Sequence, residues 1–427
     1  MAREMKETGL KWLGQIPEDW HLVRIGSQYT ERRTKVSDTE YAPLSVTMKG
    51  ILPQLSTAAK TDAHDDRKLV CKGDFAINSR SDRRGSCGIS PMDGSVSLIN
   101  TILTPREEMD PQYYDWLFHS TMFSDEYYSW GHGIVDDLWT TGWQDMKKIM
   151  IPEPSLEEQA RIAAFLDRKC AEIDSVIAAT QRTIEEYKVL KQSIITEAVT
   201  KGVRGKRPMK DSGIEWFCEI PEEWATSRVG LHYDIILGKM LCAVQPSEDY
   251  TLERYFCAAN VHFDGISDCD ALKEMWFSEQ EKKLYQVKNG DLLVVEGGAG
   301  AGGSAIVTGF TGTAFIQNSI MIVRGKKNGD NRYLRYFLEH LVKQGYIEVA
   351  CNKATIPHFT KDKLATVPSP VVPAEEQEEI ANYLDSKCSE IERLIISKQQ
   401  LLIELESYKK SVIYEYVTGK KEVPACQ

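Results

Sequence analysis

The first thing this 427-residue sequence lacks is any motif for catalysis or metal binding. It has no G-x-x-x-x-G-K-[ST] phosphate loop, which excludes an ATPase of that kind. Its 10 cysteines form no Cys-x-x-Cys pair and its 8 histidines lack ligand spacing, so no zinc site is indicated. It also lacks the Asn- or Asp-Pro-Pro-aromatic motif with which amino-methyltransferases hold an extruded base. We therefore expect no catalytic centre, no metal and no cofactor in this chain.

The sequence also lacks long apolar runs and a positive net charge. No stretch approaches the ~18–20 apolar residues of a membrane span, and no apolar signal segment opens the chain. We expect a cytoplasmic protein with reduced thiols. Acidic residues outnumber basic ones by 63 to 52, which argues against a general nucleic-acid coat but leaves room for a local basic groove.

The sequence contains an internal repeat. Residues 9–26 recur at 213–230 with a constant offset of 204. Residues 157–200 recur at 375–418, where 20 of 44 positions are identical. Each half is therefore a divergent globular region followed by a well-matched segment.

Both well-matched segments are predicted to be long helices. Ser155 is placed to cap the first helix, with Glu158 as the third residue of a capping box. Apolar residues then recur at alternating three- and four-residue steps over about six heptads, which indicates a coiled-coil seam. We also place Lys169 and Lys387 in this seam, where buried polar residues would specify register. The apolar seam residues are Ile162, Leu166, Ile173, Ile184, Ile194, Ile380, Leu384, Ile391, Leu402 and Leu405.

The repeat predicts an α+β fold in which two mixed α/β domains are separated by two long antiparallel helices. These helices would form a coiled coil, and the two halves would be related by a pseudo-twofold axis. A helix lying on its own domain is the alternative. β-type runs at 73–77, 96–103, 291–295 and 313–323 and helical patterns at 111–123 and 332–341 do not determine a topology. The predicted boundaries are 1–150 (first domain), 151–204 (first helix), 205–367 (second domain) and 368–427 (second helix).

One glycine-rich motif is compatible with either a dinucleotide-binding site or a hairpin loop. Gly298, Gly300 and Gly303 satisfy G-x-G-x-x-G directly after a strand-like run. A dinucleotide site also needs a helix at the third glycine and an acidic residue about 20 positions later. The following residues are β-branched and broken by glycine, so we expect a hairpin loop that can approach a phosphate backbone closely.

Basic and polar residues suggest recognition of DNA. Arg80, Arg83 and Arg84 lie in one polar loop after a strand, and an arginine fork can read guanine O6 and N7 or bind phosphates. A solvated loop with an internal aspartate–arginine pair is the alternative. Arg32, Arg33 and Lys35 form a second basic cluster, which we expect to position phosphates rather than to read bases. The remaining candidates offer cationic, amide or hydroxyl groups, and they are Lys49, Lys239, Asn260, His262, Asn352, Lys353 and Thr355.

Together these features resemble the DNA specificity subunit of type I restriction–modification systems. WLGQIPEDW (12–20) and WFCEIPEEW (216–224) are similar to the starts of that family's two target-recognition domains. IPEPSLEEQARIAAFLD (151–167) and SPVVPAEEQEEIANYLD (369–385) are similar to the starts of its two spacer helices. The resemblance covers essentially the whole chain, in the family's order.

The resemblance implies a non-catalytic subunit that reads a bipartite DNA target, one half-site per domain, with the helices setting the unread spacer. Two modification (methyltransferase) subunits would dock on the helices and bring S-adenosylmethionine, and two restriction subunits would bring ATP- and Mg-dependent translocation and cleavage. The alternatives are an autonomous S-adenosylmethionine-dependent DNA methyltransferase and a coiled-coil scaffold that does not bind DNA. Because recognition loops diverge within the family, the resemblance assigns no base-contacting residue.

Overall fold

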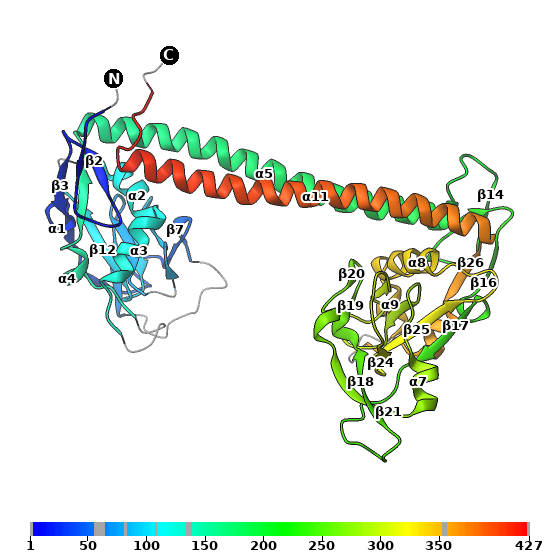
Figure 1. Ribbon diagram of the computed structural model, residues 1–427. Coiled ribbons are helices and arrows are strands. Elements are labelled where there is room, and N and C mark those ends of the chain that lie inside the picture. The colour runs from blue at the N-terminus through cyan, green and yellow to red at the C-terminus, as the bar shows by residue number, and fades with distance from the viewer. Residues whose placement is uncertain are drawn as a thin grey trace. The chain divides into compact units, whose positions relative to one another are not determined.

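The computed structural model describes residues 3–54, 65–80, 83–106, 109–133, 139–351 and 357–424. The chain divides into two compact units, unit 1 (1–182 with 398–427) and unit 2 (183–397). Each unit combines a mixed α/β domain with part of two long helices, α5 (Leu156–Lys201) and α11 (Ala374–Val417) (Figure 1). The boundaries predicted from the sequence separate the domains from the long helices. The compact units instead divide within the helices, so each unit contains part of both. Among the described residues, no helix has both the length and the apolar character that a membrane span requires.

The central sheet of each unit has the same topology. In both units four strands pair with antiparallel neighbours, and the two inner strands come from the predicted β-type runs. In unit 1 the order is β10 (Cys87–Ile89), β9 (Phe75–Asn78), β12 (Asn100–Pro105) and β4 (Tyr29–Glu31). In unit 2 it is β23 (Ser304–Ile306), β22 (Leu292–Val295), β25 (Ile320–Gly325) and β17 (Tyr233–Leu237). The repeat read from the sequence therefore extends to the sheets.

The smaller sheet differs between the units. Unit 1 has β11 (Gly94–Val96), β8 (Arg67–Val70) and β5 (Lys35–Val36), with the hairpin β6 (Leu44–Thr47) and β7 (Gly50–Pro53) beside it. Unit 2 has β21 (Lys273–Phe277), β18 (Thr251–Phe256) and β24 (Phe315–Ile316), and it adds the short pair β19 (Val261–His262) and β20 (Gly265–Ile266). The units have diverged here, outside the shared central sheet.

Short two-stranded ladders join each domain to the long helices, again in matching positions. In unit 1 they pair β1 (Met5–Glu7) with β2 (Gln15–Pro17), and β3 (His21–Arg24) with β13 (Met150–Glu153). In unit 2 they pair β14 (Met209–Asp211) with β15 (Glu219–Pro221), and β16 (Ala225–Arg228) with β26 (Pro368–Val371).

The predicted domain helices are present. The pattern at 111–123 forms α2 (Pro111–His119) and α3 (Thr121–Ser129), which break at Ser120 because its side chain caps α3. The pattern at 332–341 lies within α8 (Asn331–Lys343), which α9 (Tyr346–Ala350) follows. The remaining short helices are α1 (Ile25–Gln28), α4 (Trp143–Met146), α6 (Val229–His232), α7 (Glu279–Tyr285) and α10 (Lys361–Thr366), with 3₁₀ turns at Ala258–Asn260 and Cys269–Ala271.

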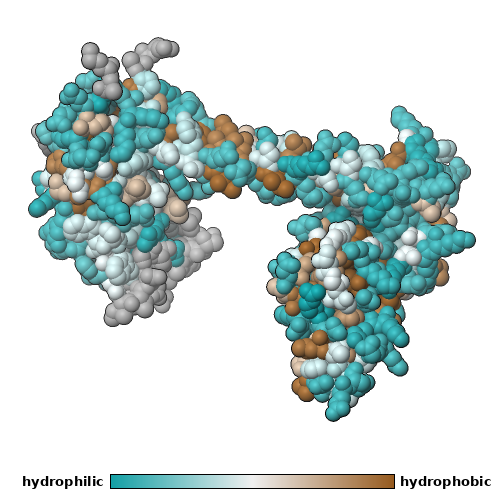
Figure 2. Space-filling view, viewed as in Figure 1, coloured by the Kyte–Doolittle hydropathy of each residue, from teal (hydrophilic) through white to brown (hydrophobic). Residues whose placement is uncertain are grey.

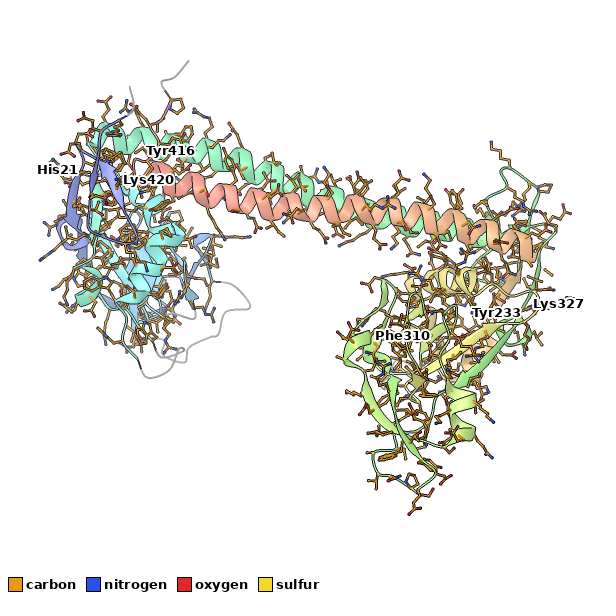
Figure 3. All side chains as sticks on the ribbon, in the orientation of Figure 1. His21, Tyr233, Phe310, Lys327, Tyr416 and Lys420 are labelled. Atoms are coloured by element: carbon orange, nitrogen blue, oxygen red, sulfur yellow. The ribbon has the colours of Figure 1, made fainter. Side chains whose placement is uncertain are left out.

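The two long helices pack antiparallel, as expected. In unit 1, the ring of Phe165 in α5 lies 4.4 Å from the ring of Tyr416 in α11, measured between centroids. Figure 3 labels Tyr416 on α11. In unit 2, Lys191 near the end of α5 pairs with Glu392 in the first half of α11 at 2.6 Å. Seven of the predicted seam residues are buried, and Ile194, Leu402 and Leu405 are partly buried. The buried seven are Ile162, Leu166, Ile173, Ile184, Ile380, Leu384 and Ile391.

The placement of two lysines in the seam was wrong. Lys169 and Lys387 pair on the surface with Glu172 and Glu390, at 3.2 and 3.0 Å, and their side chains are 35% and 45% exposed. The next residue in each helix, Cys170 or Cys388, is buried instead. An ammonium group keeps its hydration at the edge of the seam, while the thiol fills the apolar position.

Candidate nucleic-acid interface

A tryptophan–glutamate–arginine cluster fixes each domain to the start of a long helix. In unit 1, Trp20 Nε1 donates to Glu158 Oε2 at 2.9 Å, and Arg3 pairs with the same carboxylate at 2.5 Å. The Arg3 guanidinium also lies 5.4 Å from the Trp20 ring centroid. The backbone N–H of Glu158 donates to Ser155 Oγ at 3.3 Å, which confirms the cap. The Glu158 carboxylate binds Trp20 and Arg3 in place of the return bond expected of a capping box.

Unit 2 contains the same cluster. Trp224 Nε1 donates to Glu376 Oε2 at 3.0 Å, Arg207 pairs with Glu376 at 2.5 Å, and the guanidinium lies 5.0 Å from the Trp224 ring. Arg3 and Arg207 are not among the site residues predicted from the sequence. The signal was present, because these two arginines stand at the same offset of 204 as the repeated segment beside them.

A tyrosine on each domain helix holds the end of the other long helix in that unit. Tyr113 of α2 donates through its hydroxyl to the carbonyl of Val417 at 2.7 Å. Tyr333 of α8 does the same to Val199 at 3.1 Å. Each domain is thus bound to the start of one long helix and the end of the other, which gives its loops a rigid support.

The three candidate arginines of unit 1 lie in the loop from 79 to 86, between β9 and β10. Arg80 forms a bridge to Thr140, and the Tyr128 hydroxyl donates to the carbonyls of Asn78 and Arg83, at 3.2 and 3.4 Å. Arg84 lies 5.3 Å from the Tyr128 ring centroid and 3.3 Å from Asp125, with 57% of its side chain exposed. The loop is therefore anchored to α3, and it presents the side chains of Arg83 and Arg84 to solvent. The aspartate of the alternative pairing, residue 82, lies outside the described residues.

The equivalent loop of unit 2 is the glycine-rich segment from 296 to 303. It joins β22 and β23, which pair antiparallel, so it is the expected hairpin loop. Gly302 has φ +83°, and a Cβ there would lie 2.9 Å from Val342 and from Ile347, so a side chain does not fit. Gly297 bridges to His358, as Arg80 bridges to Thr140 in unit 1. The same hairpin therefore carries arginines in one unit and glycines in the other.

Three candidate residues are at least partly buried against partners in their own unit. Arg32 binds Asp74 at 2.6 Å, and this hydrogen bond raises the pKa of Arg32. Lys239 pairs with Glu281 at 2.6 Å and its side chain is 11% exposed. Asn260 is buried and accepts from the backbone N–H of Cys257 at 2.9 Å. These contacts explain the three polar groups structurally, so their contact with DNA stays a prediction.

The other candidates are exposed or lie outside the description. Arg33 has 67% of its side chain exposed and pairs with Glu31, and His262 is exposed. Lys49 is exposed in the β6–β7 turn, whose Gly50 packs against Gly88 of β10. Residues 352–356, with Asn352, Lys353 and Thr355, lie outside the described residues. The structure therefore brings together one group of candidates, the arginine loop with the Lys49 hairpin beside β10.

Comparisons with known proteins agree with this organisation. The pattern of a family described as "Type I restriction modification DNA specificity domain" matches residues 275–406. The putative type I restriction enzyme MjaX specificity subunit of Methanocaldococcus jannaschii is 28% identical over 288 residues, 65% of this chain and 60% of that protein. The type I restriction enzyme MjaVIII specificity subunit of the same organism is 24% identical over 438 residues, 96% of this chain and 94% of the relative.

Solved structures share the fold. A chain from a study of complex assembly and conformational transition of the type I R-M system is similar with a TM-score of 0.73 and 18% identity, over 95% of this chain and 99% of that one. The HsdS subunit from Thermoanaerobacter tengcongensis is similar with a TM-score of 0.57 and 19% identity, over 97% and 100%.

Proposed function

We propose that this chain, which belongs to the family of type I restriction–modification DNA specificity subunits, reads a bipartite duplex-DNA target with one half-site per unit. The observation that carries this proposal is that the two units share one supporting structure, called the frame here, but differ in the hairpin loops at its tip. The central sheet, the anchoring cluster and the helix-binding tyrosine recur, while the β9–β10 and β22–β23 loops differ in chemistry. A shared frame with divergent loops is what two different half-sites require.

The surface of the long helices supports docking of a partner present in two copies. Exposed glutamates on both helices are identical between the repeats, for example Glu186 and Glu404. An isolated helix pair has no need to keep exposed residues the same in both copies. A partner that binds each copy in the same way does impose that need.

Exposed apolar residues of the long helices lie at repeated positions too. Val176 and Leu394, which are equivalent, are 48% and 41% exposed, and the equivalent Leu190 and Tyr408 are 48% and 49% exposed. Figure 2 shows apolar side chains gathered along these helices. Exposed apolar positions of this kind mark protein–protein contacts. We assign them to two modification subunits, which would bring S-adenosylmethionine, and we assign ATP and Mg to two restriction subunits.

The test is methylation mapping in cells that express this chain with its modification subunit. We expect a split target with a spacer of fixed length. An autonomous methyltransferase would bind S-adenosylmethionine without a partner, which calorimetry on the isolated chain detects. A scaffold would give no sequence preference in any assembly. Either result would overturn the proposal.

The helices are proposed to set the spacer length. Residues 178–184 and 396–402 are equivalent heptads of α5 and α11. Deleting both preserves the seam register, because a heptad is two turns of the coiled coil. We expect a shorter spacer with both half-sites unchanged. An unchanged spacer would remove the ruler role and leave the recognition role intact.

A further inference from the structure

Two lysines face each other across a strand pair in the small sheet of unit 1. β5 and β8 pair antiparallel, and Lys35 is the direct partner of Lys68. Residues directly opposite in such a pair share a face and approach closely, so two like charges there destabilise the sheet. A neighbouring arginine, Arg33, adds a third positive charge at this edge. An arrangement that costs stability calls for a reason outside the fold.

Acidic residues of the unit neutralise only part of this charge. Lys35 pairs with Asp66 at 2.5 Å, and Arg33 pairs with Glu31 at 2.6 Å. Lys68 has no carboxylate within ion-pair distance in the described part of the chain, and its Nζ donates to the carbonyl of Asn100 at 2.7 Å.

Lys68 is also partly desolvated. Its side chain is partly buried, and burial lowers its pKa. Glu31 acts in the opposite direction, and the charge of Arg33 lowers the pKa of Lys68 further. Burial therefore disfavours the charged form of Lys68 at this position, and a bound anion would offset that cost.

The position of Lys68 connects it to the arginine loop. Asn100, whose carbonyl accepts from Lys68, is the register partner of Asn78 at the end of β9. The Asn78 side chain in turn accepts from the backbone N–H of Arg80, the first arginine of the loop, at 3.0 Å. The ammonium of Lys68 thus lies beside the base of the loop proposed to read bases.

We propose that Lys68, with Lys35 and Arg33, binds a phosphate of the DNA backbone next to the half-site that unit 1 reads. This inference rests on the proposed function. A lysine is a compact point charge suited to such a contact, and the contact positions the duplex without reading its sequence. In the paired positions of the small sheet of unit 2, no two basic residues lie opposite each other. We therefore place the phosphate site in unit 1.

The test compares the double variant Lys35→Met, Lys68→Met with Lys72→Met, an exposed lysine in the turn after β8. Each chain is assembled with its modification subunit. Affinity for the methylated target duplex, and for the same duplex with the unit 1 half-site scrambled, is measured by fluorescence anisotropy over a salt series. We expect the slope of log affinity against log salt to fall by about one to two in the double variant, equally on both duplexes. Lys72→Met keeps the wild-type slope.

Measuring the unfolding temperature of each variant distinguishes a loss of DNA binding from a loss of folding. Because methionine keeps the aliphatic stem and removes the repulsion, Lys68→Met alone should raise the unfolding temperature while it weakens binding. Lys68→Arg should keep the salt slope, because the charge remains. An unchanged slope in the double variant, or a change in the preferred bases, would overturn the phosphate site. If the wild-type complex binds no duplex, the proposed function itself fails.

Discussion

The two units hold the same buried carboxylate with different partners. Asp291 of unit 2 binds Arg324 of β25 at 2.7 Å. In unit 1 the strand equivalent to β25 is β12, and its Thr104 donates to Asp74 at 3.0 Å. The guanidinium comes instead from Arg32, just beyond β4. Both units therefore share the carboxylate, which accepts from a backbone N–H in the turn before the inner strand, while its side-chain partner differs.

The tips of the units differ in a more consequential way. The hairpin loop of unit 1 carries arginines that can form hydrogen bonds with base edges. The hairpin loop of unit 2 carries glycines, which have no side chains. Its backbone can therefore approach a ligand closely. The contacts that the two units share and the hairpin loops that differ involve different residues. Variants can therefore test the shared contacts and the loops separately.

The largest effect is expected from removing the anchoring carboxylates. Glu376→Ala removes the acceptor of Trp224 Nε1 and one of the two carboxylates that pair with Arg207, in a site where the Glu376 side chain is 1% exposed. This should cost about 3 kcal/mol, the lower end for a broken buried pair. Glu158→Ala should cost less, because its carboxylate is 11% exposed. Urea unfolding followed by hydrogen exchange in each unit measures both losses. Glu157→Ala, at an exposed position, is the control, and equal behaviour of all three variants would contradict the shared anchor.

The next prediction distinguishes two roles of Arg32, its ion pair with Asp74 and a contact with DNA. Arg32→Met leaves the buried Asp74 without its cation and should cost about 2 kcal/mol of stability. Asp74→Asn added to it should recover part of that loss. If Arg32 also contacts DNA, the double variant recovers stability while its affinity stays low in anisotropy titrations. Full recovery of affinity assigns Arg32 to the frame alone.

A smaller effect tests the tyrosines. Tyr113→Phe and Tyr333→Phe each remove one buried hydrogen bond to the end of a long helix, and each should cost about 1 kcal/mol. Chemical unfolding of the two variants and of their combination measures this. We expect additive losses, because the two bonds lie in separate units. A loss in only one variant would show that the frame is not shared at this point.

The smallest effect at neutral pH concerns an acid-sensitive residue in one unit. His340 of α8 lies between Thr196 and the carbonyl of Trp216, and burial lowers its pKa. The folded state therefore disfavours the proton, and unit 2 should lose stability as the pH falls below about 6.5. The equivalent position of unit 1 is Ser120, which does not titrate. Hydrogen exchange at pH 5 and pH 7 measures the difference, and His340→Gln should reduce it. Equal acid sensitivity of the wild-type units would contradict this assignment.

Much of the frame could be predicted from the sequence because it is periodic or repeated. The cap at Ser155, the buried seam and the duplicated order of elements all depend on residues close together in the chain or at a fixed offset. The error at Lys169 arose because a stripe with 3.5-residue periodicity admits two neighbouring positions, and only packing selects Cys170. Local pattern therefore predicted the helices but not every residue of their interface.

The candidate site was less predictable, because its chemistry depends on contacts between distant residues. Nothing near Arg32 in the sequence indicates Asp74, and nothing near Lys239 indicates Glu281. The like-charge pair of Lys35 and Lys68 depends on the register of two strands, which the sequence does not give. The three arginines of the loop could be proposed from the sequence because they lie within five consecutive residues, and their contact with DNA stays a prediction.

The central claim is that each unit reads one half of the target. The most direct test is methylation mapping of a chain with Arg80, Arg83 and Arg84 changed to Ala, coexpressed with its modification subunit, beside an Arg24→Ala control at an exposed position of the same unit. We predict that specificity is relaxed or lost at one half-site, with a cost of about 1–3 kcal/mol per specific contact, while the other half-site and the spacer stay the same. Changes at both half-sites would contradict the account, and a wild-type pattern would remove the three arginines from the recognition site.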